Sequence, residues 1–245
     1  LRGLAPLELN TDFPRPRQQS FAGAAVRRPL APERLRRLQQ LAAEHGVSLS
    51  MLLIAAFKVL LLRHTGSTDI AIGVPVANRH HLSTEALVGS FVNTLVFRTD
   101  LSGGPDFVEL LRRVREVSLQ AFEHQDMPFE VLVRELDLPH DLSRSPLFDV
   151  MFNMINTRVR DATFPVLTWQ RFDFDRRAAQ FDLTVNVDAL YNPAIVFEYA
   201  TGLFAPQTAE RLIDQYLSVL DAVVEQPGIE IGAIGCISQD ERSRL

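Results

Sequence analysis

Two adjacent histidines, His80 and His81, are followed by an acidic residue at Glu85. An imidazole next to a carboxylate can act as a general base that removes a proton from an attacking nucleophile. Residues of the same types are also common on a solvated loop, where they do no chemistry. The sequence therefore raises two alternatives for this doublet: the catalytic base of an acyltransferase, or polar loop residues.

A second candidate is the amide of Asn93, which lies in the stretch VGSFVNTLVFR (88–98). In a strand, Asn93 shares one face with Phe91, Leu95 and Phe97. A buried amide without hydrogen-bond partners costs about 1–3 kcal/mol. Asn93 therefore either bridges backbone groups inside the core, or faces a cavity and binds a substrate amide.

Two further polar stretches are HQDMPFE (124–130) and HDLSRSPLF (140–148). The first is typical of a turn that starts a helix, and in the second Asp141 and Arg144 are spaced to pair locally. No glycine-rich phosphate loop, GxSxG elbow or His-x-x-His pair occurs. The single cysteine, Cys236, forms neither an internal disulfide nor a cysteine-based metal site, so we expect no bound metal.

The overall composition excludes several classes of protein. Of 245 residues, 47% are hydrophobic and 22% charged, which is typical of a globular domain. A net charge of −5 argues against a nucleic-acid partner. The longest apolar run, MLLIAAFKVLLL (51–62), is too short to cross a membrane. With one cysteine, we expect a cytoplasmic protein. The first residue is leucine, which indicates a piece of a longer polypeptide.

The periodicity of apolar residues predicts the elements that position these residues. Helical spacing and capping signals predict helices over 32–45, 48–64, 105–125, 128–136 and 206–225. Alternating apolar residues predict strands over 69–76, 91–98, 145–156, 166–174, 180–190 and 195–201. The last two strands should form a hairpin through a turn at Tyr191, Asn192 and Pro193.

Helices and strands in this order predict one α/β domain, a two-layer α/β sandwich built on a mixed sheet. The proline-rich segment 1–30 is expected to be a linker or extended surface strap. Residues 31–228 should form the domain itself, and 229–245 a linker toward whatever follows.

The three polar stretches together resemble the last three signature motifs of condensation domains from nonribosomal peptide synthetases. Those motifs read approximately (I/V)GxFVNTxxxR, (H/N)QDxPFE and RDxSRxPL, and similarity extends over nearly the whole chain. His140 departs from the family's usual arginine, which puts any salt bridge from that position in doubt. The matching residues are Val88, Gly89, Phe91, Val92, Asn93, Thr94 and Arg98 in the first motif, His124, Gln125, Asp126, Pro128, Phe129 and Glu130 in the second, and Asp141, Ser143, Arg144, Pro146 and Leu147 in the third.

The resemblance implies the C-terminal lobe of a two-lobed fold similar to chloramphenicol acetyltransferase, with an active-site tunnel between the lobes. The family's catalytic motif, HHxxxDG, belongs to the N-terminal lobe, so no catalytic residue is expected in this chain and His80 and His81 are interpreted as loop residues. The loop 77–90 should form part of the tunnel floor. The residues expected to line the tunnel are Gly89, Phe91, Asn93 and Thr94.

The implied reaction joins a donor acyl or peptidyl thioester to the amine of an acceptor aminoacyl thioester. Phosphopantetheine arms on carrier proteins deliver both substrates, so no cofactor is expected to bind the chain directly. The implied partners are the upstream lobe, donor and acceptor carrier proteins, and a downstream adenylation domain. A non-catalytic binding or gating module and an epimerisation or heterocyclisation relative stay open as alternatives. The intact FVNT motif favours condensation, and LELNTDFPRP favours L-configured donors and acceptors.

Overall fold

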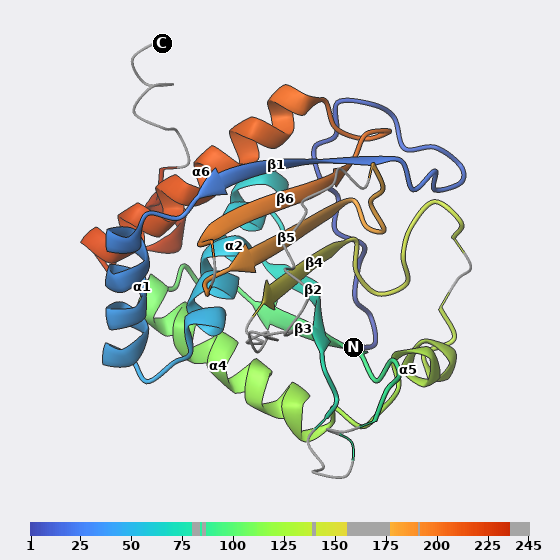
Figure 1. Ribbon diagram of the computed structural model, residues 1–245, viewed down its shortest axis with the longest axis horizontal. Coiled ribbons are helices and arrows are strands. Elements are labelled where there is room, and N and C mark those ends of the chain that lie inside the picture. The colour runs from blue at the N-terminus through green and yellow to red at the C-terminus, as the bar shows by residue number, and fades with distance from the viewer. Residues whose placement is uncertain (80–83, 85–86, 139–140, 156–176, 191, 236–245) are drawn as a thin grey trace, which may run out of the picture.

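Six strands form one mixed sheet in the computed structural model, which describes residues 1–79, 84, 87–138, 141–155, 177–190 and 192–235 (Figure 1). Their order across the sheet is β1-β6-β5-β4-β2-β3. β4 runs parallel to β2 and to β5, and the other neighbours are antiparallel. The strands are β1 (Gly23–Pro29), β2 (Asp69–Val76), β3 (Asn93–Asp100), β4 (Val150–Ile155), β5 (Leu183–Asp188) and β6 (Ala194–Ala200).

The helices begin and end at the signals that the sequence carries. The Ser48 side chain accepts a hydrogen bond from the backbone N–H of Met51, and Asp106 caps α4 in the same way through Glu109. Gly66, with φ of 69°, ends α2 in the left-handed conformation that glycine adopts without strain. The helices are α1 (Pro32–Glu44), α2 (Leu49–Thr65), α4 (Phe107–Glu123), α5 (Phe129–Glu135), α6 (Pro206–Glu225) and the short 3₁₀ helix η1 (Ile231–Ala233).

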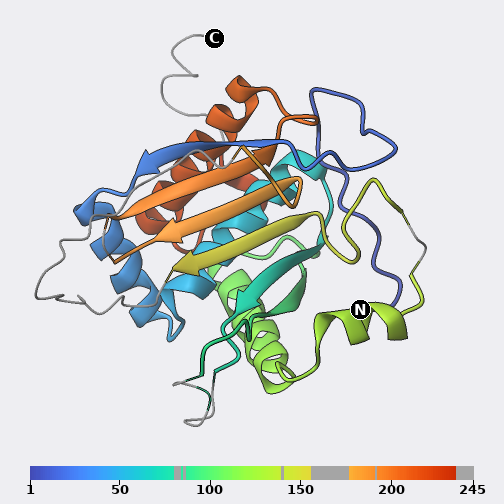
Figure 2. The ribbon, with the colours of Figure 1, turned by 45° about the vertical axis from the view of Figure 1, so that its right-hand side comes forward.

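The long helices cover one face of the sheet, with α2 at the centre of this layer (Figure 1). The Phe57 ring of α2 lies 6.2 Å from Phe152 of β4 and 6.3 Å from Phe197 of β6, between ring centroids. Both views show the strands in front of α2 and α6, with no labelled helix over the opposite face (Figures 1 and 2). On that opposite face, Asn153 and Asn186 are partly exposed side chains. The architecture is the predicted two-layer α/β sandwich.

Five predicted helices and five of the six predicted strands are confirmed, with small shifts at their ends. The antiparallel pairing of β5 with β6 confirms the hairpin. The strand expected over 166–174 lies outside the described residues. No single helix among the described residues has the length and hydropathy of a membrane span. Only the pair of α1 and α2, bent by 101°, passes that test when joined.

Segments expected to be linkers contribute to the folded domain. The expectation of a strap over 1–30 is wrong for 23–29, because β1 pairs with β6 along its whole length. Ala24 and Val26 alternate along β1 and pack against the core, a short pattern that the prolines around it obscure. At the other end, Ile231 and Ile234 are buried, so the segment 229–245 is anchored to the domain at least this far.

Lys58 is the one charged residue among the fully buried side chains of α2. Its Nζ donates to the backbone carbonyl oxygens of Ile70 at 2.8 Å and Phe97 at 2.7 Å. Burial lowers the pKa of Lys58 to about 7, against the weaker opposite effect of Asp69. A neutral amine has two hydrogens, so neutral Lys58 can donate one to each of these two carbonyl groups.

Lys58 should make the protein more stable as the pH rises. Its pKa is about 7 when folded and 10.5 when free, so between these values the unfolded chain binds the extra proton. We therefore expect the free energy of unfolding to increase by about 2 kcal/mol between about pH 7 and pH 9. Urea unfolding of the native chain and of Lys58→Met measures this, because other titrating groups contribute equally to both. An equal pH dependence in the two proteins would contradict the assignment.

Candidate functional site

The side chain of Asn93 joins the first motif to the second. Its Nδ2 donates to the carbonyl oxygens of Gln125 and Met127, each at 2.8 Å, and its Oδ1 accepts from the backbone N–H of Phe129 at 3.0 Å. Both amide hydrogens are therefore occupied by the connection between α4 and α5. These contacts fit the alternative in which Asn93 bridges backbone groups, and a role for Asn93 in a substrate tunnel stays a prediction.

The second motif is a helix-to-helix connection that Asn93 holds in place. His124 ends α4, Pro128 starts α5, and Glu130 lies in the first turn of α5. Gln125 and Asp126 lie in the turn between the two helices. The prediction that this stretch starts a helix is confirmed. Because its turn carbonyls are held by one side chain of β3, the position of α5 depends on the first motif.

Phe148 brings the third motif to the second. Its ring centroid lies 5.5 Å from that of Phe129 and 5.3 Å from that of Phe181. The Phe148 ring also covers Gly73 of β2, where an added Cβ would come within 2.3 Å of it. Glycine is therefore required at this position for the ring to lie against the sheet. An aromatic group on the face opposite to α2 thus connects β2, α5 and the segment that leads into β4.

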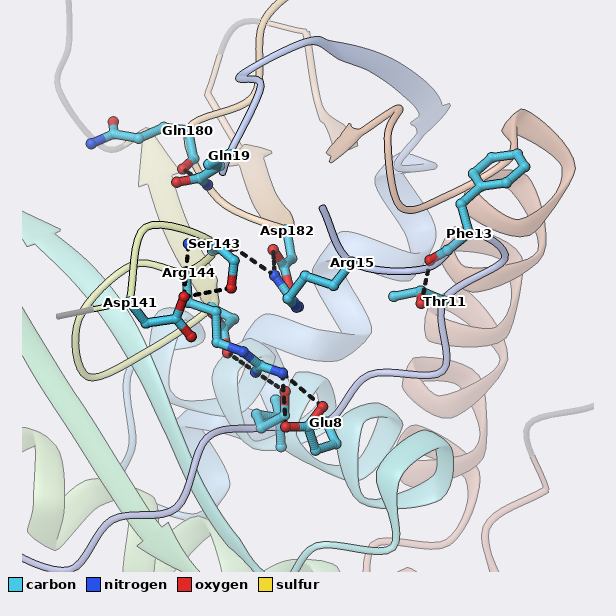
Figure 3. Close-up of polar contacts among 12 residues, drawn as sticks. Glu8, Thr11, Phe13, Arg15, Gln19, Asp141, Ser143, Arg144, Gln180 and Asp182 are labelled. Atoms are coloured by element: carbon cyan, nitrogen blue, oxygen red, sulfur yellow. Dashed lines mark hydrogen bonds and ion pairs between the residues drawn. The ribbon is translucent and has the colours of Figure 1, made fainter. Parts of the chain in front are cut away.

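Residues of the third motif form an ionic cluster with the N-terminal segment of the chain (Figure 3). Arg144 donates from Nη1 to Asp149 at 2.9 Å and from Nη2 to both carboxylate oxygens of Glu8 at 2.7 Å. Asp141 accepts instead from the N–H and hydroxyl of Ser143, at 2.8 and 2.6 Å. The expected local pair of Asp141 with Arg144 is therefore replaced by longer-range pairs, because Arg144 reaches over the loop to the 1–15 segment.

A second arginine extends this cluster to β5. The guanidinium of Arg15 donates to both carboxylate oxygens of Asp182, and its Nη1 also donates to the carbonyl oxygen of Ser143 at 3.2 Å. Asp182 in turn donates its backbone N–H to the carbonyl oxygen of Asp149 at 3.0 Å. The third motif therefore fixes the N-terminal segment to the start of β5. The departure at His140 lies outside the described residues.

Asp149 is the most perturbed carboxyl group of this cluster. Burial, and then the negative charge of Asp182, raise the pKa of Asp149 to about 6, although Arg144 and Arg15 oppose the shift. Its Oδ1 is buried and has no hydrogen-bond partner among the described residues. Hydrogen bonds from Ser143 lower the pKa of Asp141. The cluster thus ties the N-terminal segment to the start of β5, and Asp149 is its buried, incompletely paired acid.

Arg79 organises the loop that follows β2, and it was not among the residues predicted from the sequence. Its guanidinium donates to the carbonyl oxygens of Thr84, of Leu87 at 2.9 Å and of Gly89 at 2.9 Å. The guanidinium carbon also lies 4.3 Å from the ring centroid of Phe91. The available signal was an arginine at the end of the strand GVPVANR, directly before the histidine doublet. His80, His81 and Glu85 lie outside the described residues.

The four residues expected to line a tunnel occupy different environments. Gly89 and Phe91 belong to the loop held by Arg79, and Asn93 turns toward α4 and α5. Thr94 points to the other face of β3, since alternate residues of a strand face opposite ways. Within the described residues, no group of three histidine, cysteine or acidic side chains is arranged to hold a metal ion.

Replacing Asn93 by alanine should loosen the second motif. The variant leaves two carbonyl oxygens and one N–H without their partner, so we expect a loss of about 1–3 kcal/mol in the free energy of unfolding. Hydrogen exchange of the Phe129 amide should also become faster. Asn153→Ala is the matched control, because among the described residues its side chain makes one hydrogen bond, to Asn186 at 3.0 Å. Unchanged exchange at Phe129 would show that Asn93 does not hold this turn.

Comparisons with known proteins agree with the arrangement of the motifs. The sequence model of the family described as Condensation domain matches residues 1–245. Tyrocidine synthase 3 of Brevibacillus parabrevis is 40% identical over 242 residues, covering 98% of this chain and 4% of that protein. Gramicidin S synthase 2 of Aneurinibacillus migulanus is 36% identical over 243 residues, covering 98% of this chain and 5% of that protein. The chain thus spans at most 5% of the length of these two relatives.

Solved structures show the same fold. The crystal structure of a four-domain nonribosomal peptide synthetase bound to AMP and glycine has a TM-score of 0.89 and 24% identity, covering 97% of this chain and 20% of that one. The X-domain from teicoplanin biosynthesis has a TM-score of 0.87 and 29% identity, covering 96% of this chain and 54% of that one. The chain, with its three motifs joined through Asn93 and Phe148, belongs to the condensation domain family of nonribosomal peptide synthetases.

Proposed function

We propose that this chain is the C-terminal lobe of a condensation domain that forms a peptide bond between two carrier-bound substrates. The observation that carries this proposal is the joining of the three family motifs through Asn93 and the Phe129–Phe148 contact. The share of the X-domain chain that is covered, 54%, supports one lobe of two. In this proposal the lobe forms one wall of the tunnel and part of the surface on which carrier proteins dock.

In this proposal, the main contribution of this lobe to the reaction is to position the two carrier-bound substrates. The acceptor's α-amine has a pKa of about 8 when free, so a useful fraction is already unprotonated near neutral pH. The amine nitrogen attacks the thioester carbonyl, a tetrahedral oxyanion forms, and the phosphopantetheine thiol leaves as the amine loses its proton. Orientation of two tethered reactants lowers such a barrier by several kcal/mol. The base or positioning histidine belongs to the HHxxxDG motif, which the proposal places in the upstream lobe.

The sheet face opposite to α2 and the loop 77–92 are the surfaces that this proposal assigns to the upstream lobe. Val88 in that loop is fully exposed, and Leu87 and Val92 are more than half exposed. An exposed apolar cluster of this kind is unfavourable in water and is typical of an interface. Arg79 supports the proposal because it binds three backbone carbonyl groups of this loop, those of Thr84, Leu87 and Gly89.

A condensation assay on the complete two-lobed domain tests the proposed function. Donor and acceptor carrier proteins are loaded with their aminoacyl thioesters, and mass spectrometry follows the acceptor carrier. We expect a dipeptidyl thioester whose formation requires both loaded carriers. Carriers that bind the domain without product formation would favour the non-catalytic gating module. A change of configuration at the donor's α-carbon without amide formation would favour an epimerisation relative.

The histidine doublet should be unimportant for the rate. In the two-lobed domain we expect His80→Ala and His81→Ala, singly and together, to keep turnover within about threefold, since a general base contributes roughly 10²–10⁴-fold. The matched control is alanine at the second histidine of HHxxxDG, which should be far more damaging. A hundredfold or larger loss from His81→Ala, in a protein that unfolds at the normal temperature, would make His81 the base and this interpretation wrong.

A further inference from the structure

β3 is the last strand of the sheet, and its outer edge is defined by the hydrogen-bond pattern with β2. The N–H of Leu101 donates to the carbonyl oxygen of Thr68 at 2.7 Å, which makes this pair a hydrogen-bonded one. In an antiparallel ladder such pairs alternate with pairs that are not hydrogen-bonded. Counting along the register, Thr99, Phe97 and Leu95 bond to β2. The backbone N–H and C=O groups of Thr94, Val96 and Arg98 therefore point away from the sheet.

These outward groups have no partner within the part of the chain that the structure describes. One end of the edge is closed, because Nη1 of Arg113 donates to the carbonyl oxygen of Asp100 at 2.9 Å. From Thr94 to Arg98 no described side chain or backbone group makes a hydrogen bond to the edge. A row of unpaired donors and acceptors on an edge strand is a template for another extended chain.

A groove of about 800 Å³ runs along the same edge. The strand forms one wall, the C-terminal half of α4 and the start of α5 form the other, and the N-terminus lies beside it (Figure 1). Open edges in folded proteins are usually blocked by charges, bulges or covering loops. Here the edge of β3 instead borders the groove. The apolar side chains that line it are Leu1, Leu95, Val96, Val117, Ala121, Met127 and Leu132.

The groove is lined by two acidic residues, Glu123 and Asp126, and by the basic residue Arg98. Arg98 is already neutralised, because its guanidinium makes a two-point ion pair with Asp69 at 2.7 and 2.8 Å. The exposed carboxylate of Glu123, at the end of α4, has no ion-pair partner among the described residues. A segment that binds here is therefore matched by a basic residue opposite Glu123 and by apolar residues elsewhere.

We propose that the edge of β3 is a docking site for an extended peptide segment of a partner protein, which adds a seventh strand to the sheet. The backbone of the peptide pairs with Thr94, Val96 and Arg98. Its side chains alternate, as in any strand, so that every second one enters the apolar groove and a lysine or arginine meets Glu123. Thr94, which was expected to line the tunnel, belongs to this edge, but the proposal stands on the edge geometry and the groove and not on the proposed function.

A peptide library tests this site without any assumption about activity. Random ten-residue peptides displayed on phage are selected on the complete chain, and selected peptides are synthesised for binding measurements. We expect sequences in which apolar residues alternate and one basic residue recurs. We expect the amides of Thr94, Val96 and Arg98 to exchange fast in the free chain, and peptide binding should slow this exchange.

Proline at position 96 separates edge pairing from simple apolar binding. The Val96 N–H points outward, so Val96→Pro removes a donor that the β2–β3 ladder does not use. We expect at least tenfold weaker peptide binding, whereas Val96→Ala, which keeps the N–H, changes it less than about threefold. A Glu123→Gln variant should lose the preference for a basic residue. Thermal unfolding of each variant shows whether it is folded. If Val96→Pro is misfolded, strand addition is tested instead with Val96→Ala, by measuring whether bound peptide protects the amides of Thr94, Val96 and Arg98 from exchange.

Several results would overturn the proposal. These are failure of the library to yield any peptide, selection of peptides with helical rather than alternating periodicity, and bound peptides that leave the three outward amides unprotected. Undiminished binding to a folded Val96→Pro variant would equally exclude strand addition. Concentration-dependent dimerisation that protects the same amides, seen by light scattering and hydrogen exchange, would assign the edge to a second copy of the chain instead.

Discussion

No dipeptidyl thioester should form when the purified 245-residue chain is mixed with loaded donor and acceptor carrier proteins. The reason is that the proposed base and half of the proposed tunnel belong to the upstream lobe. Without them, neither proton transfer nor orientation of the two tethered substrates is available, and together these contribute many orders of magnitude to rate. Mass spectrometry of the acceptor carrier, after times at which the two-lobed domain completes the reaction, measures the outcome.

The informative control is the same chain supplied with the upstream lobe on a separate polypeptide. Recovery of product in that mixture would show that the isolated chain is folded and only incomplete. Product from the isolated chain, above a control without protein, would instead require a catalytic group within these residues, and His81 would be the first to test. That result would contradict the division of labour between the two lobes.

Replacing Arg144 by alanine should produce the largest loss of stability among the motif residues. The side chain of Arg144 is 14% exposed and that of Asp149 is 3% exposed, so the variant leaves a buried carboxylate without its partner. Removing one member of a buried ion pair is costly for that reason, and we expect a loss of roughly 3 kcal/mol in the free energy of unfolding. Arg112→Ala is the matched control: the Arg112 side chain is 64% exposed, so losing its pair with Glu109 should hardly change the free energy of unfolding.

The pH dependence provides a second readout of the same cluster. The folded state already holds the Asp149 proton more tightly than the unfolded chain, with a pKa of about 6 against 3.8. This contribution to stability is therefore present at low pH and is lost as the pH rises through about 6. Without Arg144 the pKa should rise further, so the defect of Arg144→Ala should be larger near pH 8 than near pH 5. The double variant Arg144→Ala, Asp149→Asn should recover part of the loss.

A defect of equal size at both pH values would show that Arg144 acts through packing or through Glu8 and not through Asp149. Glu8 is mostly exposed, with a side-chain exposure of 74%, so its ion pair with Arg144 should contribute little. Glu8→Gln separates the two, since it removes that pair and keeps the shape of the side chain.

The sequence by itself determined most of the secondary structure and the layer architecture. The helices and the hairpin follow from short-range causes: apolar residues at helical or alternating spacing, caps such as Ser48, and the glycine at Gly66. These signals act between residues close together in the chain, so they can be recognised in the sequence without knowledge of the tertiary structure. β1 was not predicted as a strand, because its two inward residues, Ala24 and Val26, give too short an alternating pattern beside the prolines of the same segment.

Family membership was also legible, since three short motifs in the right order are a specific signal even when their structural roles are unknown. The same motifs also indicated which residues to single out. Their roles were not determined, because a side chain such as Asn93 serves a cavity or a backbone turn according to what lies beside it.

Only the tertiary structure decided which residues contact one another. Asn93 meets Phe129 across 36 positions, Arg15 meets Asp182 across 167, and Arg144 prefers Glu8 across 136 to Asp141 nearby. The free edge of β3 could not be predicted from the sequence, because an edge exists only once the strand order is fixed. β4, the next strand along the chain, pairs with β2 and β5 and leaves β3 at the end of the sheet. Local patterns specify which face of a strand is apolar. Long-range packing specifies which residues contact that face and whether the strand edge is covered.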